Sequence, residues 1–201
     1  TFPREMEGQP VGAYLLITLD SDSEDQLYTL LEQAAELVLD AGAMDVLVAD
    51  SPAKMRDAWA ARSAFLEVIM EETKLLDECD VVVPVTKIAS YLEFVNKTDE
   101  ECGLVIRSFG HAGDGNLHIY ECSNDLTEEE FKKRVDKFFD LIYKEASAQG
   151  GLVSGEHGIG SGKIQYLVKS IGETNMALME GIKRVFDPKM ILNPGKVCYR
   201  L

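Results

Sequence analysis

Apolar and polar positions in the first part of the chain are grouped so that each group predicts a helix or a strand. A continuous apolar run at residues 11–19 predicts a buried strand, and residues 44–49 predict a second strand. Between them, leucine and alanine recur at helical spacing over residues 27–38, after a turn in which Ser23 is a good helix N-cap. A Ser-Pro pair at residues 51–52 predicts the start of another helix, which extends to about residue 74.

The second part of the chain continues in the same style, with a hairpin at its centre. The predicted strands are residues 81–83, which end at Pro84, and the hairpin pair 104–109 and 116–122. The predicted helices are residues 88–94, a long helix from the N-cap Thr127 to about residue 150, and residues 175–186. This order of elements predicts an α+β fold in which helices cover one face of an antiparallel sheet.

Composition and charge narrow the class of protein. The formal net charge of −15 argues against nucleic acid and anionic membranes as partners, because both require a basic surface, whereas a basic protein partner remains open. No apolar run reaches the length of a membrane helix, about 18 residues. The four cysteines, Cys79, Cys102, Cys122 and Cys198, form no CxxC pair, and we expect them to be reduced and structural, as in a cytoplasmic protein.

All three histidines of the chain lie in two glycine-rich segments, residues 109–118 and 154–160. Histidine is the commonest metal ligand and a frequent general base near neutral pH. Glycine allows a backbone to approach a ligand closely. A single site built from both segments is therefore the first hypothesis.

The first glycine-rich segment has the pattern of a tight hairpin. Asp114-Gly115 between two apolar runs predicts a two-residue type I′ turn, which pairs His111 directly with His118. Paired residues of neighbouring strands point to the same face with Cβ atoms about 5 Å apart. Two imidazoles in this arrangement can chelate one divalent ion. The alternative is that both histidines are simply exposed at the mouth of the hairpin.

The second glycine-rich segment adds a carboxylate and a third imidazole. Glu156 would complete a set of two histidines and one carboxylate with open positions, as in catalytic zinc and non-haem iron centres. The alternative is a flexible loop in which Glu156 and His157 are merely solvated. Nucleotide-binding and zincin motifs are absent: Gly162-Lys163 is followed by Ile164 instead of Ser or Thr, and neither GxGxxG nor HExxH occurs.

With these motifs in view, the chain resembles the C-terminal cap domain of FAD-linked oxidases, the group that includes glycolate oxidases, D-lactate dehydrogenases and D-2-hydroxyglutarate dehydrogenases. The resemblance spans nearly all of residues 1–201. The residues that carry it are the two histidine segments, Trp59-Ala60-Ala61-Arg62, Val83-Pro84-Val85 and Leu192-Asn193-Pro194-Gly195-Lys196.

The resemblance implies both a fold and a set of roles. The fold would be a ferredoxin-like antiparallel sheet with helices on one face, or two such units, with residues 1–100 and 101–201 as the candidate halves. By this resemblance, His111, His118 and Glu156 would bind a divalent metal, which is zinc, iron or manganese. His157 would be the catalytic base, and Arg62 would bind the carboxylate of the substrate. Asn193 and Gly158 would contact the cofactor. The alternative for Arg62 is an ion pair on a helix surface.

The resemblance also implies partners outside the chain. The family's flavin-binding domain has no counterpart in these residues, so we expect a fragment that holds half of an active site for a small 2-hydroxy acid. Alone, this fragment should bind its metal only weakly, lack tight FAD affinity and be inactive. An electron-acceptor protein would be a further partner. The 2-hydroxyglutarate branch carries a lysine and a threonine where this chain has Glu78 and Leu66, which favours a monocarboxylate such as lactate or glycolate. The contrasting hypothesis is a non-catalytic metal-binding or protein-interaction module.

Overall fold

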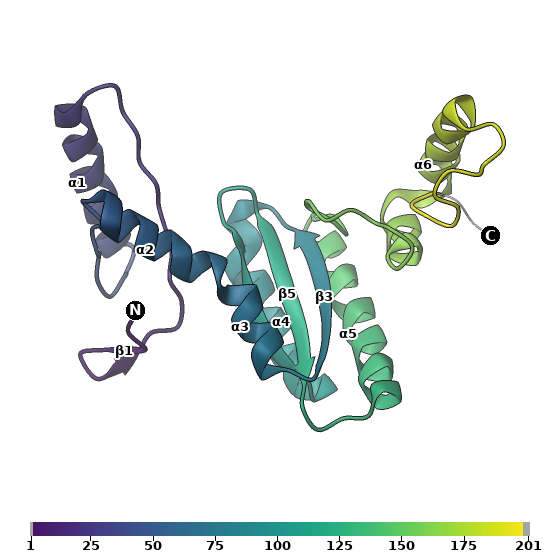
Figure 1. The fold of residues 1–201 in the computed structure, drawn as a ribbon, viewed down its shortest axis with the longest axis horizontal. Helices are drawn as coiled ribbons and strands as arrows, with labels where there is room; N and C mark the ends of the chain where they lie inside the picture. Colours follow the sequence, from purple (N-terminus) through teal and green to yellow (C-terminus); the bar gives the residue numbers. More distant parts are fainter. Residues whose placement is uncertain (1, 199–201) are drawn as a thin grey trace. The chain divides into compact units, whose positions relative to one another are not determined.

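The structure is a computed structural model that describes residues 2–198, and it divides the chain into two compact units, Thr1–Leu66 and Glu67–Leu201 (Figure 1). Helices and short antiparallel sheets make up both units, so the chain is of mixed α+β type. Among the helices of residues 2–198, none combines the length and apolar character needed to cross a membrane.

The first unit is mainly helical. Its elements are the two-residue strands β1 (Glu5–Met6) and β2 (Gln9–Pro10) and the helices α1 (Glu24–Asp40) and α2 (Pro52–Ser63), followed at the unit boundary by α3 (Phe65–Glu72). Both predicted helix starts are confirmed, because the side chains of Ser23 and Ser51 each accept a hydrogen bond from a backbone N–H in the first turn. The predicted helix 51–74 is interrupted at Ala64, the C-cap of α2.

The two strands predicted in the first unit are wrong. Residues 11–19 and 44–49 have no regular secondary structure, and Leu15 and Leu47 are 65% and 60% exposed. A strand needs a neighbouring strand for its backbone N–H and C=O groups. Apart from one bond from the Val11 N–H to the Arg4 carbonyl, no described segment pairs with either run. The apolar pattern alone contains no information on whether such a partner exists.

The second unit is built on a three-stranded antiparallel sheet. The strands are β3 (Leu75–Val82), β4 (Val105–His111) and β5 (Asn116–Ser123), in the order β3-β5-β4. The helical elements are the 3-10 helix η1 (Val85–Lys87) and the α-helices α4 (Ile88–Cys102), α5 (Glu128–Ala148) and α6 (Ile164–Phe186). The prediction was correct in type for the three strands and for α4, α5 and α6, whereas η1 was not predicted. The boundaries differ: β3 begins six residues before the predicted strand, α4 ends eight residues after the predicted helix 88–94, and α6 begins eleven residues before the predicted helix 175–186. α6 contains a break at Gly172.

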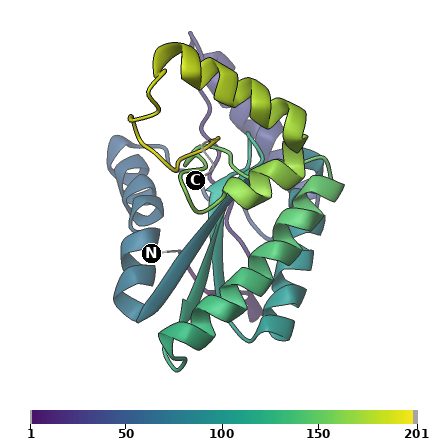
Figure 2. The same ribbon diagram turned by 90° about the vertical axis from the view of Figure 1, so that its right-hand side faces the viewer.

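The central strand β5 has two different faces, because successive side chains of a strand point in opposite directions. Leu117 and Ile119 pack with Cys79 and Val81 of β3 in the hydrophobic core beneath α4 and α5. Figure 2 shows both helices on the same side of the sheet. Each large apolar side chain buried there contributes about 1.5–3 kcal/mol to folding. His118, between Leu117 and Ile119, therefore points to the other face.

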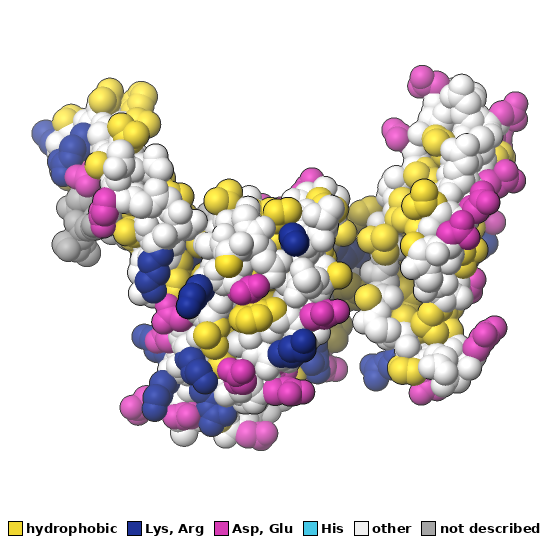
Figure 3. All heavy atoms as spheres, turned by 180° about the vertical axis from the view of Figure 1, so that it is seen from behind, with side chains coloured by type: hydrophobic (Ala, Val, Ile, Leu, Met, Phe, Trp, Pro, Cys, Tyr) yellow, Lys and Arg dark blue, Asp and Glu magenta, His cyan; other side chains and the backbone are white. Residues whose placement is uncertain are grey.

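The helical side of the molecule is shown in Figure 3, where Lys and Arg side chains are interspersed with Asp and Glu side chains. No histidine is visible on this side. The four cysteines are buried and free, as predicted. Beyond α5, Leu152 forms an isolated antiparallel bridge with Val82, so residues 151–153 run along the free edge of β3.

The hairpin register differs from the prediction by two residues. His111 pairs with Asn116 and Phe109 pairs with His118, so the loop is the four residues 112–115 instead of Asp114-Gly115. The N–H of Asp114 donates to the carbonyl of His111, which closes the longer turn. A shift of two residues preserves the face on which each side chain lies. His111 and His118 therefore remain on one face, as diagonal neighbours instead of a direct pair.

Candidate metal centre

Three imidazole rings come together on the face of the sheet opposite the helices. The rings of His111 and His118 lie 5.8 Å apart, centre to centre, and are nearly perpendicular. The ring of His157 stacks on that of His118 at 4.6 Å. His118 is only 3% exposed, whereas His111 and His157 are about half exposed. The cluster is thus buried at its centre and open at its rim.

Two histidines and one glutamate form a group that can hold a metal ion. One ligand atom from each of His111, His118 and Glu156 lies within 4.8 Å of the others. Glu156 Oε1 is 2.8 Å from His118 Nε2 and 3.7 Å from His111 Nδ1. Two imidazoles and one carboxylate suit zinc, iron or manganese. The residues present therefore fit a divalent ion with open coordination positions.

His157 lies beside this group with its two nitrogens facing different carboxylates. Its Nε2 is 3.6 Å from Glu156 Oε1, on the side of the metal-binding group. Its Nδ1 is 2.8 Å from Glu78 Oε1. An imidazole in this position has one nitrogen available to a molecule bound at the metal-binding group.

Asp80 anchors the loop that carries Glu156 and His157. This carboxylate of β3 is fully buried and accepts hydrogen bonds from the Ser154 hydroxyl at 2.6 Å and from the N–H of His157 at 2.8 Å. The N–H groups of Gly155 and Glu156 also donate to it. Burial alone would raise the pKa of Asp80, but these donors stabilise the charge and hold the pKa below its ordinary value.

Glu78 also belongs to the cluster. It lies two residues before Asp80 on the same face of β3, and its Oε1 is 3.3 Å from His118 Nδ1. From the sequence, Glu78 was expected only as a poor partner for a second carboxylate of the substrate, and the predicted strand began at Val81. The polar alternation of Glu78 and Asp80 around Cys79 was the signal that the strand begins earlier and presents two carboxylates to one face.

The charges of the cluster shift the pKa values within it. The Glu78 carboxylate raises the pKa of His118, burial opposes this, and Glu156 adds to the increase, so that the net shift is upward. Burial would raise the pKa of Glu78, but His118 and His157 outweigh it and hold the pKa below the ordinary value. The cluster therefore favours a positive charge at its centre, which a metal cation would also satisfy.

Packing requires glycine at several positions of the histidine segments, among them Gly115 and Gly155. A Cβ at Gly115 would lie 1.9 Å from the carbonyl oxygen of Val83, and the φ angle of Gly115 is +74°. A Cβ at Gly155 would lie 2.3 Å from Oδ1 of Asn116. Both distances are shorter than any real contact. Glycine at these positions lets the hairpin loop and the loop 154–158 pack tightly around the cluster.

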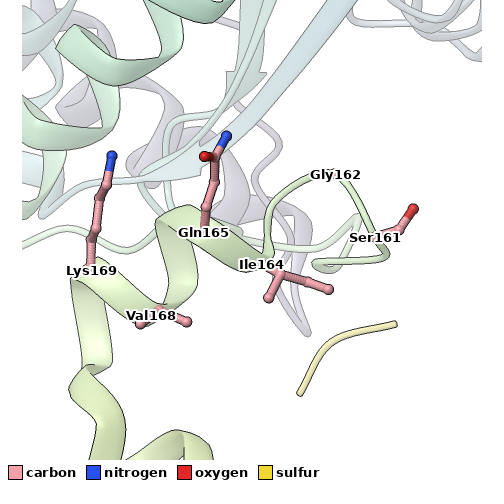
Figure 4. A pocket seen from close by; sticks show the side chains of 6 residues that line it. All are labelled: Ser161, Gly162, Ile164, Gln165, Val168 and Lys169. Carbon is pink, nitrogen blue, oxygen red and sulfur yellow. The ribbon is translucent and has the colours of Figure 1, made fainter. Parts of the chain in front are cut away.

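A separate shallow hollow lies at the start of α6. Ser161, Gly162, Ile164, Gln165, Val168 and Lys169 line it. In Figure 4, Gln165 and Lys169 point to one side of the helix and Ile164 and Val168 to the other. The hollow contains none of the clustered histidines or acids. We therefore assign the chemistry to the histidine cluster.

The sequence profile of the C-terminal domain of FAD-linked oxidases matches residues 4–197 of the chain. The chain belongs to this family. Among FAD-linked oxidases of known sequence, it is 59% identical to a D-lactate dehydrogenase of Anaerostipes hadrus over 200 residues, which is 100% of this chain and 42% of the relative. It is 37% identical to a D-lactate dehydrogenase of Archaeoglobus fulgidus, over 94% of the chain and 40% of the relative.

A third FAD-linked oxidase extends the range of relatives. The chain is 31% identical to the glycolate oxidase subunit GlcD of Bacillus subtilis over 94% of its length, which again covers 40% of the relative. The chain thus spans about two fifths of the length of the relatives it matches. Membership in this family of oxidoreductases implies FAD as a cofactor.

Three further predicted site residues of this FAD-linked oxidase domain are Gly158, Asn193 and Arg62. Gly158 follows His157 directly, with a φ angle of +78°, and its N–H donates to the Ser154 hydroxyl. Asn193 lies after α6 with a φ angle of +45°. Arg62 lies in the last turn of α2, in the first unit. The structure brings together His111, His118, Glu156 and His157, and the roles of the other three stay predictions.

Proposed function

We propose that this chain is the substrate- and metal-binding cap domain of an FAD-dependent 2-hydroxy acid dehydrogenase. The observation that carries the proposal is the convergence of His111, His118 and Glu156 beside His157, in a chain of the FAD-linked oxidase family. The relatives named D-lactate dehydrogenase and glycolate oxidase subunit support a small 2-hydroxy acid as the substrate.

The residues of the cluster have distinct tasks in this proposal. His111, His118 and Glu156 would hold the metal, which would supply Lewis-acid stabilisation of a substrate hydroxyl group as it loses its proton. His157 Nε2, which faces the metal-binding group, would receive that proton. Flavin would supply the hydride acceptor. The cluster thus combines substrate orientation with proton removal.

Substrate selection follows from charge. Glu78 is ionised at neutral pH, because its pKa lies below the ordinary value, and it lies at the edge of the cluster. A second carboxylate on the substrate would be repelled there, which supports lactate or glycolate over a dicarboxylic acid. Arg62 would bind the single carboxylate through the planar fork of its guanidinium group.

The proposal also includes a ferredoxin-like fold for the second unit. β3, α4, β4, β5, α5 and the bridge at Leu152 follow the strand–helix–strand–strand–helix–strand order of a ferredoxin-like unit. In this proposal the fourth strand is reduced to a single bridge. The ferredoxin-like fold is proposed for the second unit alone, because the described sheet of the first unit is only the hairpin of β1 and β2.

The test uses the whole flavoprotein and its metal content. We expect a chelator to remove the turnover of D-lactate or glycolate, and zinc, manganese or iron(II) to restore it. His111→Ala and His118→Ala should each lose the metal and the turnover but retain the yellow flavin, because flavin is bound elsewhere. Glu129→Gln, an exposed change on α5, serves as the control.

Two results would contradict the proposal. Full turnover by metal-free protein would exclude a role of the metal in the reaction. Unchanged metal content in both histidine variants, measured by elemental analysis, would exclude the ligand set. A protein that retains metal in a histidine-dependent way but oxidises no 2-hydroxy acid would instead support the non-catalytic metal-binding module.

A further inference from the structure

One carboxylate oxygen of the cluster faces the same nitrogen of two different histidines. Glu78 Oε1 is 3.3 Å from His118 Nδ1 and 2.8 Å from His157 Nδ1. The two rings are stacked with an interplanar angle of 23°, and the distances to Glu78 Oε1 place both Nδ1 atoms on the side of that carboxylate. The Nε2 atoms of both rings face Glu156 instead, at 2.8 and 3.6 Å.

The sheet register places Glu78 where it can reach both rings. Asp80 pairs with His118 across β3 and β5, and Glu78 pairs with Tyr120. Glu78 is therefore the diagonal neighbour of His118 on the same face. Its side chain is 31% exposed, so the carboxylate is partly removed from water and its interactions with the imidazoles are little screened.

The proton position on His118 follows from its role as a ligand. A metal held through Nε2 uses the lone pair of that nitrogen, so the neutral ring carries its proton on Nδ1. His118 Nδ1 and Glu78 Oε1 are both buried, and among the described residues neither atom has a hydrogen-bond partner, although they lie 3.3 Å apart. A buried N–H without an acceptor is costly, and Glu78 Oε1 is the carboxylate oxygen placed to accept from it.

The same reasoning applies to His157. To remove a proton from a bound hydroxyl group, Nε2 must have a free lone pair, which requires the proton to be on Nδ1. Glu78 Oε1 lies next to that Nδ1 atom. A carboxylate accepts hydrogen bonds and donates none, so it favours the Nδ1–H form of either ring.

We infer that Glu78 is a positioning residue that fixes His118 and His157 in the Nδ1–H form, so that the Nε2 atoms of the ligand and of the base both face the metal-binding group. The inference rests on the proposed function and adds a residue to it. Metal-ligating histidines commonly donate their second N–H to a carboxylate, and loss of that partner costs about 10–100-fold in metal affinity. In this chain one carboxylate serves a ligand and the base together.

The first measurement is zinc affinity in the whole flavoprotein. Metal-stripped protein is titrated with zinc chloride against a chromophoric chelator of known affinity. We expect Glu78→Gln and Glu78→Ala to bind zinc about 10–100-fold more weakly than the wild type, still with one zinc per chain. Glu78→Asp, which keeps the charge, should recover most of the affinity. Glu93→Gln, the same change on the exposed side of α4, should leave it unchanged.

The second measurement separates positioning from folding. The turnover of D-lactate or glycolate is measured at saturating zinc and expressed per zinc-loaded, flavin-containing chain. We expect Glu78→Gln to lower kcat by at least about tenfold with little change in KM, because His157 acts on the proton and not on substrate binding. A merely structural role would reduce the amount of loaded protein but not the kcat of each loaded chain.

Three outcomes overturn the inference. Zinc affinity and kcat equal to the wild type in both Glu78→Gln and Glu78→Ala would show that Glu78 positions neither ring. Two zinc ions per wild-type chain, reduced to one by Glu78→Gln, would make Glu78, His118 and His157 a second metal site. A wild type that neither binds zinc nor oxidises a 2-hydroxy acid would refute the proposed function, and this inference with it. A wild type that does both, with silent Glu78 variants, refutes this inference alone.

Discussion

Replacing Asp80 with asparagine tests whether one buried carboxylate holds the loop that carries Glu156 and His157. Asp80 is fully buried and accepts hydrogen bonds from the Ser154 hydroxyl and from three consecutive backbone N–H groups, at residues 155–157. Asparagine has nearly the same shape but no charge. It keeps one acceptor oxygen and replaces the other with a donor, which cannot pair with a backbone N–H.

The magnitude follows from the two shortest bonds, those from the Ser154 hydroxyl at 2.6 Å and from the His157 N–H at 2.8 Å. A hydrogen bond to a charged group contributes about 1.5–3 kcal/mol, and a neutral one about 0.5–1.5 kcal/mol. Loss of the charge therefore costs about 1–1.5 kcal/mol per bond, or about 2–3 kcal/mol for both. This free energy corresponds to a change of about 30- to 140-fold in the equilibrium between the closed and open loop.

Hydrogen–deuterium exchange of the whole protein, followed by mass spectrometry, measures this equilibrium directly. In Asp80→Asn, amide exchange in peptides that cover residues 154–158 should be about 30- to 140-fold faster, because each amide exchanges only when the loop opens. Exchange in β5 and α5 should be unchanged. Asp136→Asn, an exposed change on α5, is the control. A rate within about threefold of the wild type would refute the reasoning and show that other contacts hold the loop.

Two further predictions concern a predicted site residue and a core residue. Arg62→Lys should increase KM for the 2-hydroxy acid by at least about tenfold, because an ammonium group cannot bind a carboxylate through a planar fork. Unchanged steady-state kinetics would contradict this role and assign Arg62 to an ion pair on the helix surface. Glu121 is fully buried, neither of its carboxylate oxygens has a hydrogen-bond partner within residues 2–198, and burial raises its pKa well above the ordinary value of 4.5. The folded protein keeps this carboxyl protonated where the unfolded chain ionises it, so stability is lost as the pH rises above about 4.5. Glu121→Gln should therefore increase the melting temperature at pH 7 relative to the wild type more than at pH 4, and an equal difference at both pH values would contradict this.

The parts of the fold that the sequence predicts correctly are those set by local interactions. The helix starts after Ser23, Ser51 and Thr127 depend on a side chain that bonds to an N–H three residues later, so the pattern is contained in a few neighbouring residues. The unpaired runs 11–19 and 44–49 show the opposite case. Whether an apolar run becomes a strand depends on a partner far away in the sequence.

The candidate site likewise contains some residues that the sequence identifies and others that depend on contacts distant in the sequence. The two glycine-rich segments identify His111, His118, Glu156 and His157 without any structure, because the residue types and their spacing are unusual. The registers of the hairpin and of β3 are not readable in this way, since loop length and strand start depend on packing. For that reason Asp80 was missed, and Glu78 was considered only as a substrate contact.

Gly115 and Gly155 have a consequence for how the family diverges. Both positions are fixed by close packing around the cluster, and neither glycine supplies a ligand atom. His111 and His157 are instead fixed by chemistry alone, since they are about half exposed and contribute little to the core. A gene duplicate that has lost catalysis would thus keep both glycines, while these two histidines drift to other polar residues. Such a degenerate paralogue can be recognised from its sequence before any assay is made.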